Sequence, residues 1–199
     1  MGFDLDMTLV DTRPGIRQAL VALAEETGRP IDADAIVAAL GPPVADALSP
    51  WFTPDELPQA VTRFRQHMAK VGVMNVAPLP GAAAAIGAAR AAGYGVLVVT
   101  AKIEPLAVAT LANAGLYADK VFGNVWAEGK AEPLRSCKAV CYAGDHPGDM
   151  FAAARASVPS YGVTTGASTR EELVAAGATH VSTSLESFPE WLRALPQTS

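Results

Sequence analysis

The segment Gly2-Phe-Asp-Leu-Asp-Met-Thr-Leu-Val-Asp11 is the most informative part of the sequence, because a short apolar run leads directly into a cluster of polar side chains. We expect residues 1–5 to form a very short β-strand, with Asp4, Asp6 and Thr8 at or just beyond its end. In an open parallel sheet, ligands bind beyond the carboxyl ends of the strands. The polar side chains of this segment are therefore the first candidates for a functional site.

The rest of the chain alternates short apolar runs with Ala-rich helical stretches. Residues 95–100 form a continuous apolar run, which is typical of a strand buried on both faces. Alternating strand and helix units predict an α/β fold with a doubly wound parallel sheet and right-handed crossovers. Further strands are predicted at 121–125, 139–143, 158–163 and 179–182. Helices are predicted at 82–92, 104–114, 130–135, 147–156, 169–176 and 185–195.

One long segment, residues 13–78, interrupts this alternation and carries no convincing strand. We predict its helices at 13–28, 32–40, 44–48 and 54–70. Thr12 and Thr53 are plausible helix starts, and Gly28 is a plausible stop. We therefore interpret residues 13–78 as an inserted all-helical cap, and residues 1–12 and 79–199 as the α/β core.

Polar residues follow several of the predicted strands at the same edge of the sheet. These candidates are Asp4, Asp6, Thr100, Lys130, Asp145 and Asp149. Carboxylates crowded into a small space raise one another's pKa or require a cation. Magnesium fits this requirement, because it binds a few carboxylates, keeps several waters and shares its shell with phosphate. Thr100 and Lys130 then supply a hydroxyl and a cation for phosphate oxygens.

Together these residues resemble the motifs of the haloacid dehalogenase (HAD) superfamily. Residues 2–11 look like its first motif, Val98-Val-Thr100 its second, Lys130 its third and Gly144-Asp-His-Pro-Gly-Asp149 its fourth. Each motif alone is weak, but the four stand in the family's order on matching strand ends and span nearly the whole chain. The resemblance implies a Rossmann-like HAD core. The helical insert is similar to the small cap of the phosphoglycolate-phosphatase-like branch.

The resemblance also implies a magnesium-dependent phosphatase that works through an aspartyl-phosphate. Asp4 would be the nucleophile, and Asp6 would first donate a proton to the leaving alcohol and then accept one from water. The residues implied to bind phosphate oxygens are Thr100, Ala101 and Lys130, with Thr100 and Lys130 also stabilising transition-state charge. The implied metal ligands are Asp4, Asp6 through its backbone carbonyl, Asp145 and, supporting the metal or its waters, Asp149. The substrate would be a small phosphorylated metabolite, phosphoglycolate-like or a sugar phosphate, bound under a closing cap.

Several positions depart from this pattern or are open to two interpretations. Family members usually carry Gly where this chain has Met7, and Gly permits backbone angles that Met resists. We expect His146 to face outward, although it neighbours Asp145. Arg13 and Lys102 are equally consistent with substrate contacts and with solvated surface positions. The turn at 41–43 is either a cap loop that faces the site or an ordinary helix break.

Three other functions are weighed against a phosphatase. A dehalogenase lacks the second acidic residue of the first motif, so Asp6 argues against that chemistry. A phosphomutase would retain Asp4 and Asp6, and the sequence leaves it open. A non-catalytic binding or regulatory protein would be signalled by loss of Asp4, Asp6 or Lys130, and all three are present.

Composition narrows the remaining classes. The net charge of −5 and the lack of a long Lys/Arg run argue against a nucleic-acid partner. No apolar run reaches the roughly 20 residues of a membrane span, and no signal peptide is recognised, so a cytoplasmic location is the default expectation. Cys137 and Cys141 lack further ligands at zinc spacing, and we interpret them as core thiols. The oligomeric state is left open.

Overall fold

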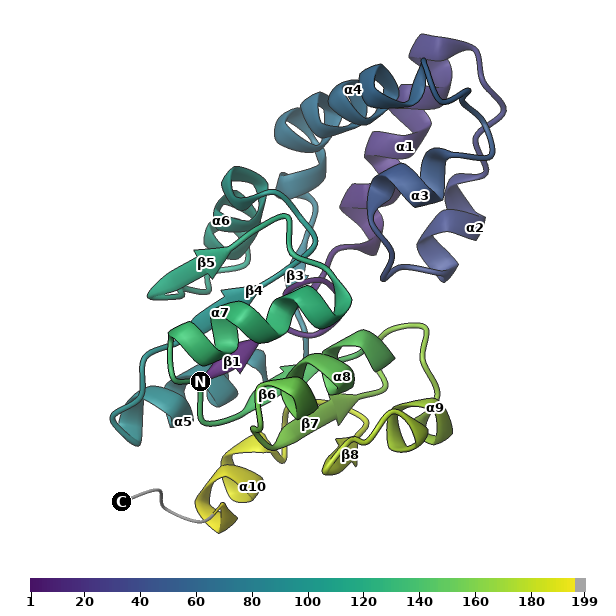
Figure 1. Cartoon of the computed structure of the whole chain (residues 1–199). Helices are drawn as coiled ribbons and strands as arrows, with labels where there is room; N and C mark the ends of the chain where they lie inside the picture. The colour runs from purple at the N-terminus through teal and green to yellow at the C-terminus, as the bar shows by residue number, and fades with distance from the viewer. Residues whose placement is uncertain (196–199) are drawn as a thin grey trace.

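A six-stranded parallel sheet forms the centre of the molecule (Figure 1). The computed structural model describes residues 1–195 of the chain. The strand order is β5-β4-β1-β6-β7-β8, which places the first strand in the middle, between β4 and β6. The strands are β1 (Gly2–Phe3), β4 (Leu97–Val99), β5 (Lys120–Phe122), β6 (Tyr142–Gly144), β7 (Ser160–Val163) and β8 (His180–Ser182). The predicted doubly wound α/β fold is confirmed.

Helices cover both faces of this sheet, as its buried strands require. On one face, buried residues of the strands pack against α5 (Ala82–Ala91), α6 (Glu104–Asn113) and α10 (Phe188–Ala194). On the other face lie α7 (Ala131–Ser136), α8 (Pro147–Arg155) and α9 (Arg170–Ala175). The many alanines of α5 and α8 allow these helices to pack closely on the strands.

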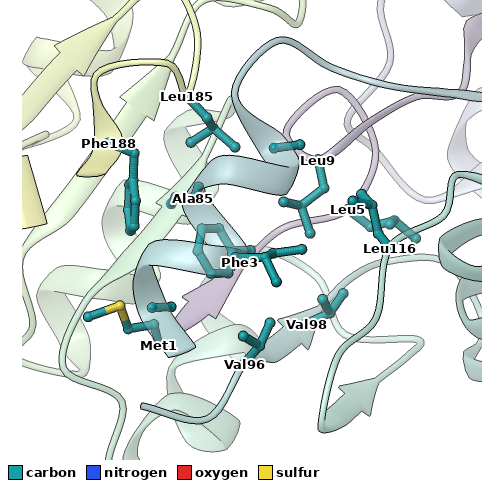
Figure 2. Packing of buried hydrophobic residues seen from close by; sticks show 14 of the residues in the cluster. Met1, Phe3, Leu5, Leu9, Ala85, Val96, Val98, Leu116, Leu185 and Phe188 are labelled. Carbon is teal, nitrogen blue, oxygen red and sulfur yellow. The ribbon is translucent and has the colours of Figure 1, made fainter. Parts of the chain in front are cut away.

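Phe3 lies in the middle of the larger core (Figure 2). Its fully buried ring contacts Phe188 at a centroid distance of 5.2 Å, and Val98 and Ala85 belong to the same cluster. Burying an aromatic side chain of this size stabilises a fold by about 1.5–3 kcal/mol. Because Phe3 directly precedes Asp4, this packing also fixes where the first motif leaves the sheet.

The helical insert packs around a second hydrophobic cluster, which also includes Leu106 of α6, and lies beyond one end of the sheet (Figure 1). Its elements are α1 (Arg13–Thr27), α2 (Ala33–Ala38), α3 (Val44–Leu48), α4 (Leu57–Lys70) and the 3-10 turn η1 (Gly72–Met74). Gly28 ends α1 in the left-handed conformation, as predicted for a helix stop. The division of the chain into core and cap as separate domains stays a prediction.

The insert is not entirely helical, so one part of the sequence prediction is wrong. Residues 77–78 form β3 (Ala77–Pro78), which pairs antiparallel with β2 (Val10–Asp11). The two segments that link the insert to the core therefore run side by side. A two-residue strand that contains a proline gives no alternating pattern, and only the pairing across the two links reveals it.

Other predicted boundaries differ by a few residues. The helix predicted at 54–70 begins at Leu57, because the Glu56 carboxylate accepts hydrogen bonds from the backbone and hydroxyl of Thr53 and closes a separate turn. Thr12 stands at the start of α1, but its hydroxyl makes no capping bond. A 3-10 turn, η2 (Ala127–Lys130), precedes α7, so the helix predicted from 130 starts one residue later. In the described part of the chain, no helix has the length and apolarity needed to span a membrane.

Candidate active site

The ends of the central strands and the inner side of the cap enclose one cavity of about 110 Å³. Its floor includes Asp4, Asp6, Thr100, Lys130 and Asp145, so the residues that the sequence predicts from separate segments lie together. A single water needs roughly 10–15 Å³ on this scale, so the cavity is large enough for a small molecule. Ala101 and Lys102 also line it, because they follow Thr100 directly.

Lys130 is the organising cation of the floor. Its ammonium donates to Asp4 Oδ1 at 2.8 Å and to Asp149 Oδ1 at 2.7 Å, and the side chain is only 2% exposed. Tyr142 donates a further hydrogen bond to Asp149 Oδ1 at 3.3 Å. The other carboxylate oxygen of Asp149 accepts from the backbone N–H of His146 and caps α8. Asp149 therefore serves as an anchor for Lys130 as well as a member of the acidic cluster.

The carboxylates of Asp4, Asp145 and Asp149 form a cluster that could hold a metal ion. One oxygen from each lies within 4.8 Å of the other two, and all three side chains are buried. Thr8 donates to Asp145 Oδ1 at 2.9 Å and orients that carboxylate. Gly166 lies so close to Asp145 that a Cβ at position 166 would be 1.9 Å from Asp145 Oδ2. Hard carboxylate oxygens converging in this way are a donor set suited to a divalent cation.

The Asp6 side chain is placed differently from this trio. It is partly exposed to the cavity and accepts a hydrogen bond from the ammonium of Lys102, whose side chain is 7% exposed. The metal-ligating cluster within the described residues does not include the Asp6 carboxylate. Lys102 and Arg13 were each consistent with a substrate contact or a surface position. Lys102 lines the cavity, whereas Arg13 pairs with Asp11 and does not belong to the cavity lining.

Met7 adopts the left-handed backbone conformation, with φ at 60°. Glycine adopts this conformation readily, which accounts for the glycine expected at the position. The turn is held by a bond from Met7 N–H to the Val10 carbonyl at 2.9 Å, and the Thr165 hydroxyl donates to the Met7 carbonyl. The Met7 side chain is 2% exposed, so burial offsets part of the backbone strain.

Burial makes the site electrostatically unusual. Removal from water, together with the nearby carboxylates of Asp149 and Asp6, raises the pKa of Asp4 to about 7 despite the opposing effect of Lys130. Burial is also the largest cause of the raised pKa of Asp145, with Asp4 and Asp149 adding to it. For Lys130, burial favours the neutral amine, but attraction to Asp149 and Asp4 outweighs it and raises the pKa. The three carboxylates of the cluster therefore exceed the single positive charge of Lys130, and a bound cation would compensate the difference.

Two aromatic rings on the cavity wall escaped the sequence prediction. The prediction that His146 faces outward is wrong, because the side chain is half-buried and accepts from Gly148 N–H through Nδ1. Its ring packs against Trp126 with the centroids 4.9 Å apart and the planes tilted by 46°. The loop at 41–43 lines the same cavity, and a Cβ on Gly41 would come within 2.9 Å of the His146 ring. In the sequence, only its position next to Asp145 indicated that His146 could belong to the site. No sequence feature indicated this for Trp126.

The fold and the buried acidic cluster at the ends of the central strands agree with the predicted resemblance to the HAD superfamily. The sequence profile of the haloacid dehalogenase-like hydrolase family matches residues 2–163. The chain belongs to the haloacid dehalogenase-like hydrolase family. This confirms the predicted superfamily and the prediction of an enzyme.

Two curated relatives are similar to the chain over most of its length. One is a phosphoglycolate phosphatase from Rhodospirillum rubrum, 32% identical over 96% of this chain and 89% of the relative. The other is the probable phosphatase IndB from Dickeya dadantii, 32% identical over 87% of this chain and 84% of the relative.

Solved structures support the fold. A haloacid dehalogenase-like hydrolase from Streptococcus pneumoniae superposes with a TM-score of 0.83 at 20% identity, covering 96% of each chain. A putative β-phosphoglucomutase from Thermotoga maritima gives a TM-score of 0.73 at 20% identity, covering 98% of each chain. Because a hydrolase and a putative mutase share this architecture, similarity at about 20% sequence identity concerns the fold alone.

Proposed function

We propose that the protein is a magnesium-dependent phosphomonoester hydrolase that transfers the phosphoryl group of a small metabolite to Asp4 and then to water. The observation that carries this proposal is the contact between Lys130 and Asp4 beside the acidic cluster, on the floor of a cavity that also holds Asp6 and Thr100. The curated relatives, both phosphatases by name, agree with it.

In the first step, a carboxylate oxygen of Asp4 attacks phosphorus and the bond from phosphorus to the leaving oxygen breaks. Asp6 gives its proton to that oxygen, so the alcohol departs neutral. In the second step, Asp6 takes a proton from water while the water oxygen attacks phosphorus and releases Asp4. Lys130 and the hydroxyl of Thr100 stabilise the negative charge that spreads over the phosphoryl oxygens.

The metal would be held by Asp4, Asp145 and the backbone carbonyl of Asp6, with Asp149 in support. When bound, a divalent cation neutralises phosphoryl charge and compensates the excess of carboxylates. The donor set is all oxygen, which favours Mg²⁺ over softer metals. The substrate would be a small phosphorylated compound, because the cavity under the cap has a volume of only about 110 Å³.

Release of inorganic phosphate from p-nitrophenyl phosphate, with Mg²⁺ and with a chelator, tests this function. Asp4→Asn should lower the rate on the order of 10⁴-fold or more, because it removes the nucleophile. Asp55→Asn is the matched control, since Asp55 is exposed and outside the cavity. Full activity in Asp4→Asn, or equal rates with chelator, would contradict the proposal. Free phosphate as product, in place of an isomerised sugar phosphate, separates hydrolysis from phosphomutase activity.

A further inference from the structure

The cavity above the proposed phosphate site has walls of unequal chemistry. Its floor carries the charged and hydroxyl groups Asp4, Asp6, Thr100, Lys130 and Asp145. The side contributed by the cap is formed by the apolar side chains Ile16, Leu20, Leu40, Val44, Phe64 and Met68. Whatever alcohol is esterified to the phosphate must lie against this second wall when the phosphate reaches the floor.

The part of the cavity between the floor and the cap offers few hydrogen-bond partners for hydroxyl groups of a substrate. Apart from the floor groups, the cavity lining of residues 1–195 contains no serine, threonine, tyrosine, amide or carboxylate side chain. A buried hydroxyl that finds no hydrogen-bond partner loses its hydration without compensation. The core side adds Ile103 and Leu106, which are apolar, and the Trp126 ring, which is apolar except for the single donor of its indole N–H.

The polar exceptions are largely engaged or hydrated. The Lys102 ammonium is bound to Asp6. His146 Nδ1 accepts from Gly148 N–H and its ring packs at a tilt against Trp126, so the donor of His146 is its Nε2–H. Arg65, on α4, is the charged cap residue in the lining, and it remains partly exposed. An arginine that retains water needs no ligand to satisfy it.

We propose that the substrate is the monophosphate of an apolar alcohol, alkyl or aryl, in preference to a polyhydroxylated sugar phosphate. The proposal rests on the phosphatase function above and narrows its substrate class. The apolar cap wall removes the hydrocarbon part of the leaving group from water, while the phosphate is held at the floor. Val44, half-buried at the start of α3, is a residue that sets this preference.

The test compares kcat/KM for n-propyl phosphate and glycerol 1-phosphate, which share a three-carbon chain and differ by two hydroxyls. Ethyl and n-butyl phosphate extend the series, with phosphoglycolate and glucose 6-phosphate as further substrates. We expect n-propyl phosphate to exceed glycerol phosphate by about tenfold or more. Each added methylene should raise kcat/KM about fourfold until the cavity is full, equivalent to about 0.8 kcal/mol per buried methylene.

A matched pair of variants locates the effect. Val44→Thr replaces a methyl by a hydroxyl at nearly constant volume, and it should reduce the preference for n-propyl over glycerol phosphate severalfold. Val37→Thr makes the same change at a half-buried cap residue outside the cavity lining, and it should leave the preference unaltered. Circular dichroism checks that both variants fold.

Each remaining outcome counts against the inference. Equal or higher kcat/KM for glycerol phosphate, with phosphate still released, would overturn the apolar substrate class and leave the phosphatase function standing. A tenfold preference for phosphoglycolate that is lost in Arg65→Gln would overturn it in favour of an anionic leaving group. Absence of phosphate release from every substrate in the presence of Mg²⁺ would contradict the phosphatase function itself, and the inference with it.

Discussion

At the scale of single residues, Lys130 carries the electrostatic balance of the site. It is a lysine enclosed almost completely by protein, and it contacts two carboxylates, those of Asp4 and Asp149. A buried ion pair of this kind adds little net stability, because desolvation offsets much of the attraction. Removing one partner is nevertheless costly, because the other charges remain buried.

Lys130→Met should therefore destabilise the metal-free protein by about 3–5 kcal/mol. Phosphate release should fall by about 10²–10³-fold, because a group that stabilises the transition state is lost. Urea unfolding and steady-state kinetics measure the two effects. Lys70→Met, at an exposed residue that ends α4, should change neither. Wild-type stability in Lys130→Met would show that the contacts to the carboxylates are not maintained in solution.

Met7 gives a second prediction at this scale. Met7→Gly relieves the strain of a left-handed backbone, which costs about 1–2 kcal/mol. The change also removes about 1.5–3 kcal/mol of side-chain burial. In addition, glycine raises the entropy of the unfolded chain, which lowers stability further. We expect a net loss of roughly 1–2 kcal/mol in thermal unfolding, with kcat within about threefold of wild type. A tenfold increase in kcat would mean that Met7 distorts the catalytic turn.

At the scale of elements, the cap loop meets the core through Gly41. The backbone φ of this glycine is 146°, and the His146 ring lies directly opposite it. Gly41→Ala should hinder closure of the cap and raise KM roughly threefold to tenfold with a smaller effect on kcat. Gly28→Ala is the control, because it adds a Cβ at positive φ where nothing lies within 4 Å. It should cost about 1 kcal/mol of stability and leave KM unchanged; equal KM values in both variants would argue against the contact.

The arrangement of the elements was only partly predictable from the sequence. The alternation of apolar runs and helices was enough to predict the parallel sheet and the grouping of Asp4, Thr100, Lys130 and Asp145, because strand order does not alter which edge their strands end on. The pairing of β2 with β3 was missed, because it depends on two chain segments meeting in space. The contact between Lys102 and Asp6 and the contact between the His146 and Trp126 rings were not predictable for the same reason.

At the scale of the whole molecule, the acidic site couples stability to pH and to metal. The pKa of Asp4 is raised by burial to about 7 in the folded, metal-free protein, against about 3.8 for an exposed carboxyl. Between these values the folded state binds more protons than the unfolded state, so stability falls as pH rises. Asp145 contributes in the same direction.

Relative to Asp4→Asn, we expect the melting temperature of the wild type in a chelator to decrease as pH rises from about 4 to about 7. The comparison is needed because burial lowers the pKa of His146 and His180, which changes stability in the opposite direction in both proteins. Mg²⁺ should counteract this decrease, by about 2.7 kcal/mol at a concentration of 100 times its dissociation constant. Differential scanning calorimetry across this pH range, with and without Mg²⁺, measures both effects. The same pH dependence in the wild type and in Asp4→Asn, or a Mg²⁺ effect that survives in Asp145→Asn, would count against the acidic cluster as the metal site.

The most direct test of covalent catalysis is acid quenching during turnover, followed by peptide mass spectrometry. An acyl phosphate persists long enough in acid for the modified peptide to be isolated. We expect one added phosphoryl group on the peptide that contains Asp4, present in wild type with substrate and absent in Asp4→Asn. A phosphorylated residue elsewhere, or steady turnover with no modified Asp4 at any quench time, would contradict it.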